Sequence, residues 1–136
     1  MIGLDTNVVI RFLAQDDEAQ SPAATRLISR LSPERPGFIS LVVLAEITWV
    51  LASAYKASRL RIAQAVDGLL RSAELIVEGA GAAYRALAAY EASATGEFAD
   101  ALIAQVAALA GATEAVTFDR KAAAQFGMRL LEAAHP

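Results

Sequence analysis

Short apolar runs alternate along this chain with longer stretches of helical periodicity. The runs near residues 1–4, 38–39, 75–77, 116–118 and 128–131 predict strands. The stretches between them predict helices over residues 8–13, 21–31, 41–55, 58–71, 82–93, 97–111 and 120–127. Because short strands that alternate with helices form parallel sheets with right-handed crossovers, we predict one α/β domain over residues 1–136, with a central, mostly parallel sheet flanked by helices.

Serine residues stand before three of these helices, where their side chains can accept hydrogen bonds from free backbone N–H groups. Ser21 with Pro22 predicts an N-cap followed by the first helical residue, and Ser40 and Ser58 predict further N-caps. The helix that ends at Gly111 has an apolar side that we expect to face the interior, formed by Leu102, Ile103, Val106 and Leu109.

The composition excludes several kinds of chemistry. Hydrophobic residues make up 56% of the chain and charged residues 20%, which excludes disorder. There is no cysteine, so disulfides and thiolate metal sites are excluded. The single histidine, His135, lies one residue from the end of the sequence. Proton transfer is therefore expected from carboxylates or metal-bound water rather than from imidazole.

The net charge of −3 excludes binding of nucleic acid by bulk positive charge, although a local basic patch stays open. No signal peptide is evident at the N-terminus. Residues 37–55 contain one charged residue, Glu46, which would cost about 2.5–3.5 kcal/mol in a membrane helix. We therefore read this stretch as buried soluble structure and expect a cytoplasmic protein without a membrane segment.

Acidic residues follow two of the predicted strands. Asp5, with Thr6 and Asn7, follows the first strand, and Asp119 follows Thr117 at the end of a later one. Ligands of open α/β sheets bind beyond the carboxyl ends of the strands, so both aspartates are candidates for chemistry. The alternative for each is a helix N-cap.

Three further carboxylates lie on predicted helices. Glu97 and Asp100 stand in the first turn of their helix, where an acidic residue also complements the helix dipole. Glu46 lies in a helix that is apolar nearly all round, so we expect its carboxylate to be at least partly buried. The alternative is a narrow solvent-facing stripe that Glu46 shares with Thr48 or Ser53.

In a parallel sheet Asp5 and Asp119 would lie at one edge, and the neighbouring helices can bring Glu46 and Asp100 there. Two carboxylates about 4 Å apart repel each other by roughly 4 kcal/mol, so such a cluster needs a cation. Oxygen ligands without His or Cys favour Mg²⁺ or Mn²⁺. The expected chemistry is metal-assisted hydrolysis of a phosphodiester.

These segments together resemble the PIN-domain family, in particular VapC-type ribonuclease toxins of type II toxin-antitoxin systems. The motifs, which stand in family order, are Leu4-Asp5-Thr6-Asn7, the run from Ile39 to Glu46, Phe98 to Ile103, and Thr117-Phe118-Asp119. The resemblance implies a PIN-like three-layer fold and a Mg²⁺- or Mn²⁺-dependent endoribonuclease.

Carried over by position, the resemblance assigns an acidic quartet and a group of supporting residues. The quartet is Asp5, Glu46, Asp100 and Asp119, of which Asp5, Asp100 and Asp119 would hold the metal. The supporting residues are Thr6, Asn7, Glu97 and Thr117, with Thr117 at the hydroxyl position that supports the first aspartate. Glu97 replaces an aspartate that is common in the family, so an outer role is expected for it.

The resemblance also implies a homodimer and a small antitoxin protein that covers the acidic groove. For the RNA substrate, Arg11, Arg120 and Lys121 are candidate phosphate contacts, and the alternative is that they are ordinary solvated charges.

Two other classes of protein remain open. A phosphate-accepting receiver-like domain would need an adjacent acidic pair after the first strand, and Asp16-Asp17 comes too late in the chain. A catalytically silent PIN-like interaction module would not need the complete quartet.

Overall fold

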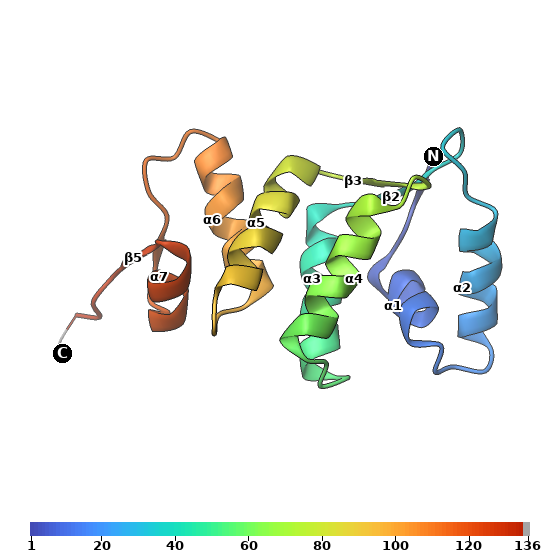
Figure 1. Ribbon diagram of the computed structural model, residues 1–136, viewed down its shortest axis with the longest axis horizontal. Helices are drawn as coiled ribbons and strands as arrows, with labels where there is room; N and C mark the ends of the chain where they lie inside the picture. Colours follow the sequence, from blue (N-terminus) through green and yellow to red (C-terminus); the bar gives the residue numbers. More distant parts are fainter. Residues whose placement is uncertain (135–136) are drawn as a thin grey trace. The chain divides into compact units, whose positions relative to one another are not determined.

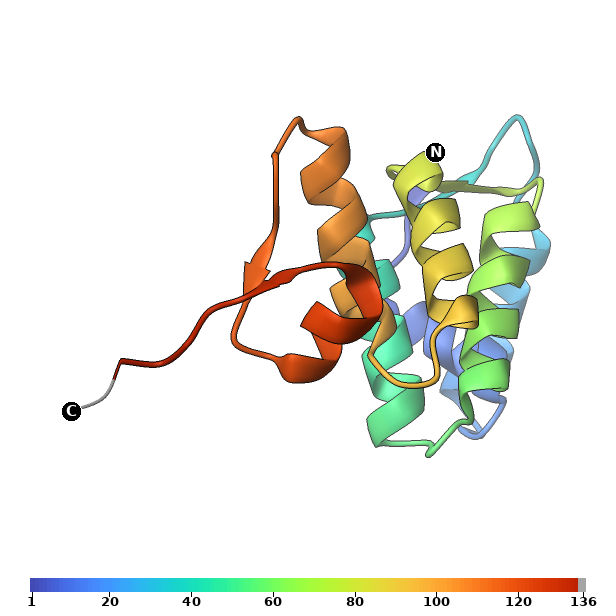
Figure 2. The same cartoon turned by 60° about the vertical axis from the view of Figure 1, so that its left-hand side comes forward.

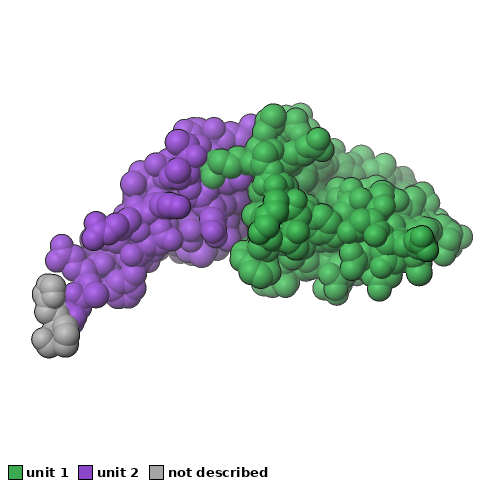
Figure 3. Space-filling model, turned by 90° about the horizontal axis from the view of Figure 1, so that it is seen from below, with its two compact units in different colours: residues 1–80 green, residues 81–136 purple. Residues whose placement is uncertain are grey.

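The computed structural model describes residues 1–134, so His135 lies outside the described residues. The chain divides into two compact units, Met1–Ala80 (unit 1) and Gly81–Pro136 (unit 2), which Figure 3 shows in green and purple. Each unit has its own parallel strands and its own helices.

Unit 1 is built on a three-stranded parallel sheet of order β1-β2-β3. The strands are β1 (Ile2–Gly3), β2 (Gly37–Ile39) and β3 (Leu75–Val77), and all are short. Gly37 is buried, and a Cβ there would lie 2.9 Å from a methyl group of Leu4 and 3.0 Å from one of Leu75. Glycine at this position therefore lets the side chains around the middle strand close over it.

Four helices flank this sheet: α1 (Thr6–Ala14), α2 (Gln20–Ser29), α3 (Leu41–Ser53) and α4 (Arg59–Arg71). Helix α1 contacts α2 and α3, α3 contacts α4, and α4 contacts β3 (Figure 1). The largest fully buried side chains all belong to this unit: Ile10, Ile39, Leu44, Ile47, Val9 and Val66. The helices and the sheet thus share one hydrophobic core.

The predicted N-caps are confirmed for two helices and wrong for one. Ser40 and Ser58 cap α3 and α4 through their side-chain oxygens. Ser21, in contrast, lies buried inside α2. The carboxylate of Asp17 accepts the hydrogen bond of the Gln20 N–H at 2.7 Å and so satisfies the start of the helix instead. Because Asp17 reaches the free N–H groups from the preceding turn, the helix begins before Ser21.

Unit 2 contains α6 (Phe98–Leu109), β4 (Val116–Thr117), α7 (Arg120–Phe126) and β5 (Arg129–Leu130), and most of α5 (Ala80–Ala92). Strands β4 and β5 pair in parallel, and α7 connects them. Helix α7 lies against α6 (Figure 2). The rings of Tyr90 and Phe98 meet edge to face, with centroids 6.0 Å apart, and join α5 to the start of α6.

The predicted inner side of α6 is wrong for most of its members. Leu102 is buried, but Ile103 and Leu109 are 56% and 54% exposed, and Val106 is also exposed. The buried face is formed near the start of the helix by Phe98, Ala101 and Leu102. Because apolar residues surround this helix, the sequence pattern does not select the face that is buried.

The predicted α/β class, with parallel strands flanked by helices, is confirmed, and a strand is present in each of the five predicted places. Among the described residues, no helix combines the length and the hydropathy that a membrane crossing requires.

Candidate functional site

Asp5 lies between β1 and α1 and caps the helix. Its Oδ1 accepts the N–H of Thr6 at 2.8 Å, while the backbone N–H of Leu4 donates to the Phe38 carbonyl at 2.9 Å and holds the chain on the sheet. The capping alternative for Asp5 is therefore confirmed. Since this bond uses one oxygen of an exposed side chain, capping is compatible with a second role for the carboxylate.

Glu46 is an exposed residue, contrary to the expectation that its carboxylate is at least partly buried. Helix α3 buries Leu44 and Ile47 completely and leaves the opposite face open, which includes Glu46 and Ser53. The alternative of a solvent-facing stripe with Ser53 is correct. Thr48, in contrast, is buried.

A buried hydroxyl orients the Glu46 carboxylate. Thr6 is 6% exposed, and its Oγ1 donates to Glu46 Oε1 at 3.2 Å across 40 residues of sequence. This hydrogen bond links the first turn of α1 to the middle of α3. Thr6 therefore lies beside Asp5 in sequence and in contact with Glu46.

The start of α3 is fixed by a residue that sequence reasoning missed. Glu78, directly after β3, accepts the N–H of Leu41 at 2.9 Å through Oε1, and Ser40 accepts the N–H of Val43 at 3.2 Å. A carboxylate at a helix N-terminus is also favoured by the helix dipole. No local sequence signal connects Glu78 to a helix that begins 37 residues earlier.

In unit 2, Asp119 stands between β4 and α7 in the same way as Asp5 stands between β1 and α1. Its Oδ1 accepts the N–H groups of Lys121 at 2.8 Å and Ala122 at 3.0 Å. Thr117 Oγ1 accepts the N–H of Asp119 itself at 2.9 Å. The capping alternative is confirmed here too, and Thr117 holds the turn that presents the Asp119 carboxylate.

Asp100 lies partly buried in the first turn of α6. Burial raises the pKa of its carboxyl above the ordinary value, and the negative charges of Asp119 and then Glu97 raise the pKa further. The Asp100 carboxyl therefore lies in the electrostatic field of the other two carboxylates. Ionisation of such a carboxyl costs free energy, and a bound cation would offset this cost.

The candidate residues fall into two groups. Asp5, Thr6 and Glu46 belong to unit 1, and Asp100 and Asp119 belong to unit 2 with Glu97 and Thr117. Among the described residues, no group of three His, Cys, Asp or Glu side chains is close enough to hold a metal ion by itself. The convergence of all four quartet residues therefore stays a prediction.

The chemistry of the donors fits a hard divalent cation. Both groups offer only carboxylate and hydroxyl oxygens, and such oxygen ligands suit Mg²⁺ and Mn²⁺. The salt bridges among the described residues join Arg11 to Asp16, Arg71 to Asp67 and Arg129 to Glu114, so none of them neutralises a quartet carboxylate.

The candidate RNA contacts differ in their surroundings. Arg11 donates through Nε to Gln20 at 2.8 Å and through Nη1 to Asp16 and Tyr55, both at 3.3 Å, so its guanidinium is held within unit 1. Arg120 and Lys121 are exposed in the first turn of α7, directly after Asp119. Their contact with RNA stays a prediction.

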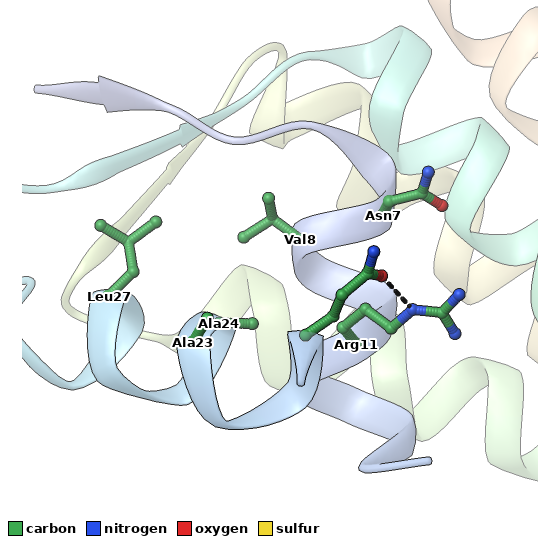
Figure 4. A pocket seen from close by; sticks show the side chains of 7 residues that line it. Asn7, Val8, Arg11, Ala23, Ala24 and Leu27 are labelled. Atoms are coloured by element: carbon green, nitrogen blue, oxygen red, sulfur yellow. Dashed lines mark hydrogen bonds between the residues drawn. The ribbon is translucent and has the colours of Figure 1, made fainter. Parts of the chain in front are cut away.

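A pocket of about 340 Å³ lies between α1 and α2 (Figure 4). Its lining is apolar on one side and polar on the other, with Asn7, Arg11 and Gln20 next to Val8, Ala23, Ala24 and Leu27. Asn7, the last residue of the Leu4-Asp5-Thr6-Asn7 motif, therefore lines a pocket at the surface of unit 1.

Comparison with protein families shows where the chain belongs. Residues 2–126 match the PIN domain, a range that spans both compact units, so this chain is a member of the PIN domain family. PIN domains are generally nucleases and typically use divalent metals, which gives the chain a nuclease role. A search of curated proteins found no match.

Proposed function

We propose that this chain is a Mg²⁺- or Mn²⁺-dependent endoribonuclease that hydrolyses RNA phosphodiester bonds. The main support is Asp100, because its carboxyl is partly buried beside Asp119 and Glu97 and its pKa is raised as a result. A cation removes this repulsion, and an oxygen-only donor set favours the hard ions that bind phosphate. The PIN family membership supports the same nuclease chemistry.

In this proposal Asp5, Asp100 and Asp119 hold the metal. The backbone bonds that Asp5 and Asp119 accept limit the motion of their carboxylates. The chemistry that Mg²⁺ or Mn²⁺ supplies at such a site is polarisation of the attacking water and stabilisation of negative charge on the phosphate oxygens.

Glu46 accepts a proton from the attacking water in this scheme. Its Oε1 is engaged by the Thr6 hydroxyl, which leaves Oε2 to take the proton. Because Glu46 is exposed on α3, solvent and substrate can reach it. Asn7, Glu97 and Thr117 orient the surrounding groups without binding the metal directly.

We further propose that the enzyme is a VapC-type toxin that acts in the cytoplasm as a homodimer and is inhibited by a small antitoxin protein. The support is the family resemblance of the motifs together with the pocket between α1 and α2 beside Asn7. Its apolar side, formed by Val8, Ala24 and Leu27, suits an apolar side chain of an antitoxin that also covers the carboxylates.

The test is cleavage of total bacterial RNA by antitoxin-free protein in Mg²⁺, in Mn²⁺ and in EDTA, for wild type and Asp100→Asn. Loss of an outer-shell partner costs about 10–100-fold in a metal site, so loss of a direct ligand is expected to cost more than about 100-fold. The EDTA sample is expected to show no cleavage.

Asp17→Asn is the matched control, because Asp17 is a helix-capping aspartate of the same chain with no role in the proposal. This variant is expected to cut like wild type. If wild type is inactive with both metals, or if folded Asp100→Asn cuts equally well, the nuclease assignment is wrong and the interaction-module alternative takes its place.

A further inference from the structure

The first turn of α3 is held by side chains from outside the helix. It consists of Leu41, Val42 and Val43, which are uncharged and only partly buried or exposed. The Oγ of Ser40 accepts the N–H of Val43 at 3.2 Å, and Oε1 of Glu78 accepts the N–H of Leu41 at 2.9 Å. Glu78 therefore supplies the acceptor and the negative charge that a helix N-terminus favours.

The connection between β3 and α5 consists of Glu78 and Gly79, and both residues fit the start of α3. The backbone N–H of Glu78 donates to the Ile39 carbonyl at 2.8 Å, which fixes Glu78 beside the end of β2. Gly79 has φ +59, and a Cβ there would lie 3.0 Å from Cδ1 of Leu41. Glycine thus allows the connection to close over the first residue of the helix.

Glu46 depends on this first turn through its own backbone. In an α-helix each N–H donates to the carbonyl four residues earlier, and for Glu46 this residue is Val42. Leu41 lies five residues before Glu46, a rise of about 7.5 Å. Because Glu46 is exposed, the helix backbone and the hydrogen bond from Thr6 set the position of its carboxylate. Fraying of the first turn would therefore move Glu46 relative to Thr6.

We propose that Glu78 is a positioning residue for Glu46 in the proposed RNA cleavage. This role rests on the proposed ribonuclease function and adds a carboxylate that contacts neither the metal nor the substrate. Glu78 holds the N–H of Leu41, the first turn of α3 stays formed, and the Glu46 carboxylate stays within reach of the Thr6 hydroxyl.

Three variants separate the reach of the Glu78 side chain from its charge. Glu78→Gln keeps an oxygen acceptor at the same reach and removes the charge. Glu78→Asp keeps the charge on an arm that is one methylene shorter, and Glu78→Ala removes both. If Glu78 acts through its hydrogen bond to Leu41, Glu78→Gln is expected to behave like wild type and Glu78→Asp like Glu78→Ala.

The first measurement is kcat and KM in Mg²⁺ or Mn²⁺, on an RNA oligonucleotide that contains a site cut by wild type in total bacterial RNA. Loss of a cap shifts the formation of a helix end by about 2- to 30-fold, so kcat of Glu78→Ala and Glu78→Asp is expected to fall by up to about 30-fold. KM is expected to stay unchanged, because Glu78 does not contact the substrate. In a Glu46→Gln background, Glu78→Ala is expected to lower kcat no further.

Amide hydrogen exchange in EDTA gives a second readout that needs no catalysis. It follows the amides of residues 44–46, whose helical acceptors lie at residues 40–42. We expect faster exchange of these amides in Glu78→Ala and Glu78→Asp, and exchange as in wild type in Glu78→Gln.

Ser58→Ala is the matched control, because it removes a single cap of another helix in the same unit. Ser58 accepts the N–H of Arg61 at 3.2 Å at the start of α4. Thermal unfolding is expected to show a loss of stability similar to that of Glu78→Ala. Neither kcat nor the exchange of residues 44–46 is expected to change.

The possible failures are distinct. If Glu78→Ala cuts like wild type, or if Ser58→Ala lowers kcat equally, the positioning role is wrong and the nuclease function stands. If Glu78→Asp keeps the wild-type rate and Glu78→Gln loses it, the charge acts and the positioning role is again wrong. Should Glu78→Ala not fold, Glu78→Asp gives the same test. If wild type cuts no RNA with either metal, the proposed function fails and the role of Glu78 in it fails too.

Discussion

The two units hold their carboxylates in opposite ways. In unit 1 a neutral hydroxyl, that of Thr6, hydrogen-bonds Glu46 and stands next to Asp5 in the chain. In unit 2 the carboxyl of Asp100 lies in the field of Asp119 and Glu97, and its pKa is raised. Unit 1 therefore orients a carboxylate, whereas unit 2 gathers negative charge.

The two units therefore differ in how far their carboxylates depend on a cation. A carboxylate that accepts a hydroxyl hydrogen bond is stable in its charged form without a metal. Carboxylates that repel each other in a partly buried place carry their charge at a cost in free energy, and a counter-charge removes this cost. We therefore expect substitutions in unit 1 to change catalysis through orientation and substitutions in unit 2 to change metal binding and metal-free stability.

Outside the proposed metal ligands, the largest effect on cleavage is expected from Thr6→Val, which keeps the shape of the side chain and removes the hydroxyl. Glu46 then loses the hydrogen bond that orients it as the proton acceptor, and RNA cleavage is expected to fall by up to about 100-fold, the lower end of what a positioned general base contributes. Thr6→Ser restores the hydroxyl and is expected to recover most of the rate. Thermal unfolding of all three proteins is the check on folding. Equal cleavage by Thr6→Val and wild type would show that the hydroxyl has no orienting role.

A smaller effect on stability is expected from Gly96→Ala in unit 2. Gly96 has φ +98, and a Cβ there would lie 2.7 Å from the Phe126 ring, so the substitution combines backbone strain with a clash. We expect a loss of more than about 1 kcal/mol in the free energy of unfolding, measured by urea denaturation. The residue precedes the helix that presents Asp100, so metal binding is expected to weaken as well.

Gly111→Ala separates the two contributions. Gly111 has φ +95, but a Cβ there would meet no atom within 4 Å. The backbone strain is therefore similar and the clash is absent, so Gly111→Ala is expected to cost less than Gly96→Ala. Equal costs would show that the contact with Phe126 adds nothing to the packing of unit 2.

The fold was largely predictable from the sequence because its signals are local. Short apolar runs ending in polar residues located every strand, and Ser40 and Ser58 marked two helix starts. The buried faces of α3 and α6 were not predictable, because both helices are apolar nearly all round and tertiary contacts alone choose the face. Glu46 was therefore expected to be at least partly buried and Ile103 to face the interior, whereas both are exposed.

In the candidate site, too, the features with local sequence signals were predictable and the long-range contacts were not. Asp5 and Asp119 were found because each follows a strand, a signal within a few residues. The bond from Thr6 to Glu46 and the capping of α3 by Glu78 join residues 40 and 37 positions apart. Such contacts depend on how helices and strands pack, so no spacing in the sequence predicts them.

The smallest expected effect is also the sharpest test of the difference between the units. The pKa of Asp100 in the folded chain lies above its value in the unfolded chain, so its ionisation opposes folding at neutral pH. Asp100→Asn removes that charge and is expected to raise the metal-free stability at pH 7 by about 0.2–0.5 kcal/mol, the usual size of a like-charge pair on a helix. The gain disappears as the pH falls below 3.8, where the carboxyl of the wild type is protonated in both states.

Glu114→Gln, in the same unit, has the opposite sign. Hydrogen bonds from Arg129 at 2.9 Å lower the pKa of Glu114, so its charge stabilises the folded chain above the unfolded pKa and this contribution is lost as the pH falls. Its removal is expected to lower stability at pH 7.

With Mn²⁺ at about 100 times its dissociation constant, the free energy of unfolding of wild type is expected to rise by roughly 2.7 kcal/mol and that of Asp100→Asn by much less. Urea denaturation with and without Mn²⁺ measures all three proteins, and a metal-free Asp100→Asn less stable than wild type would show that unit 2 does not gather uncompensated charge.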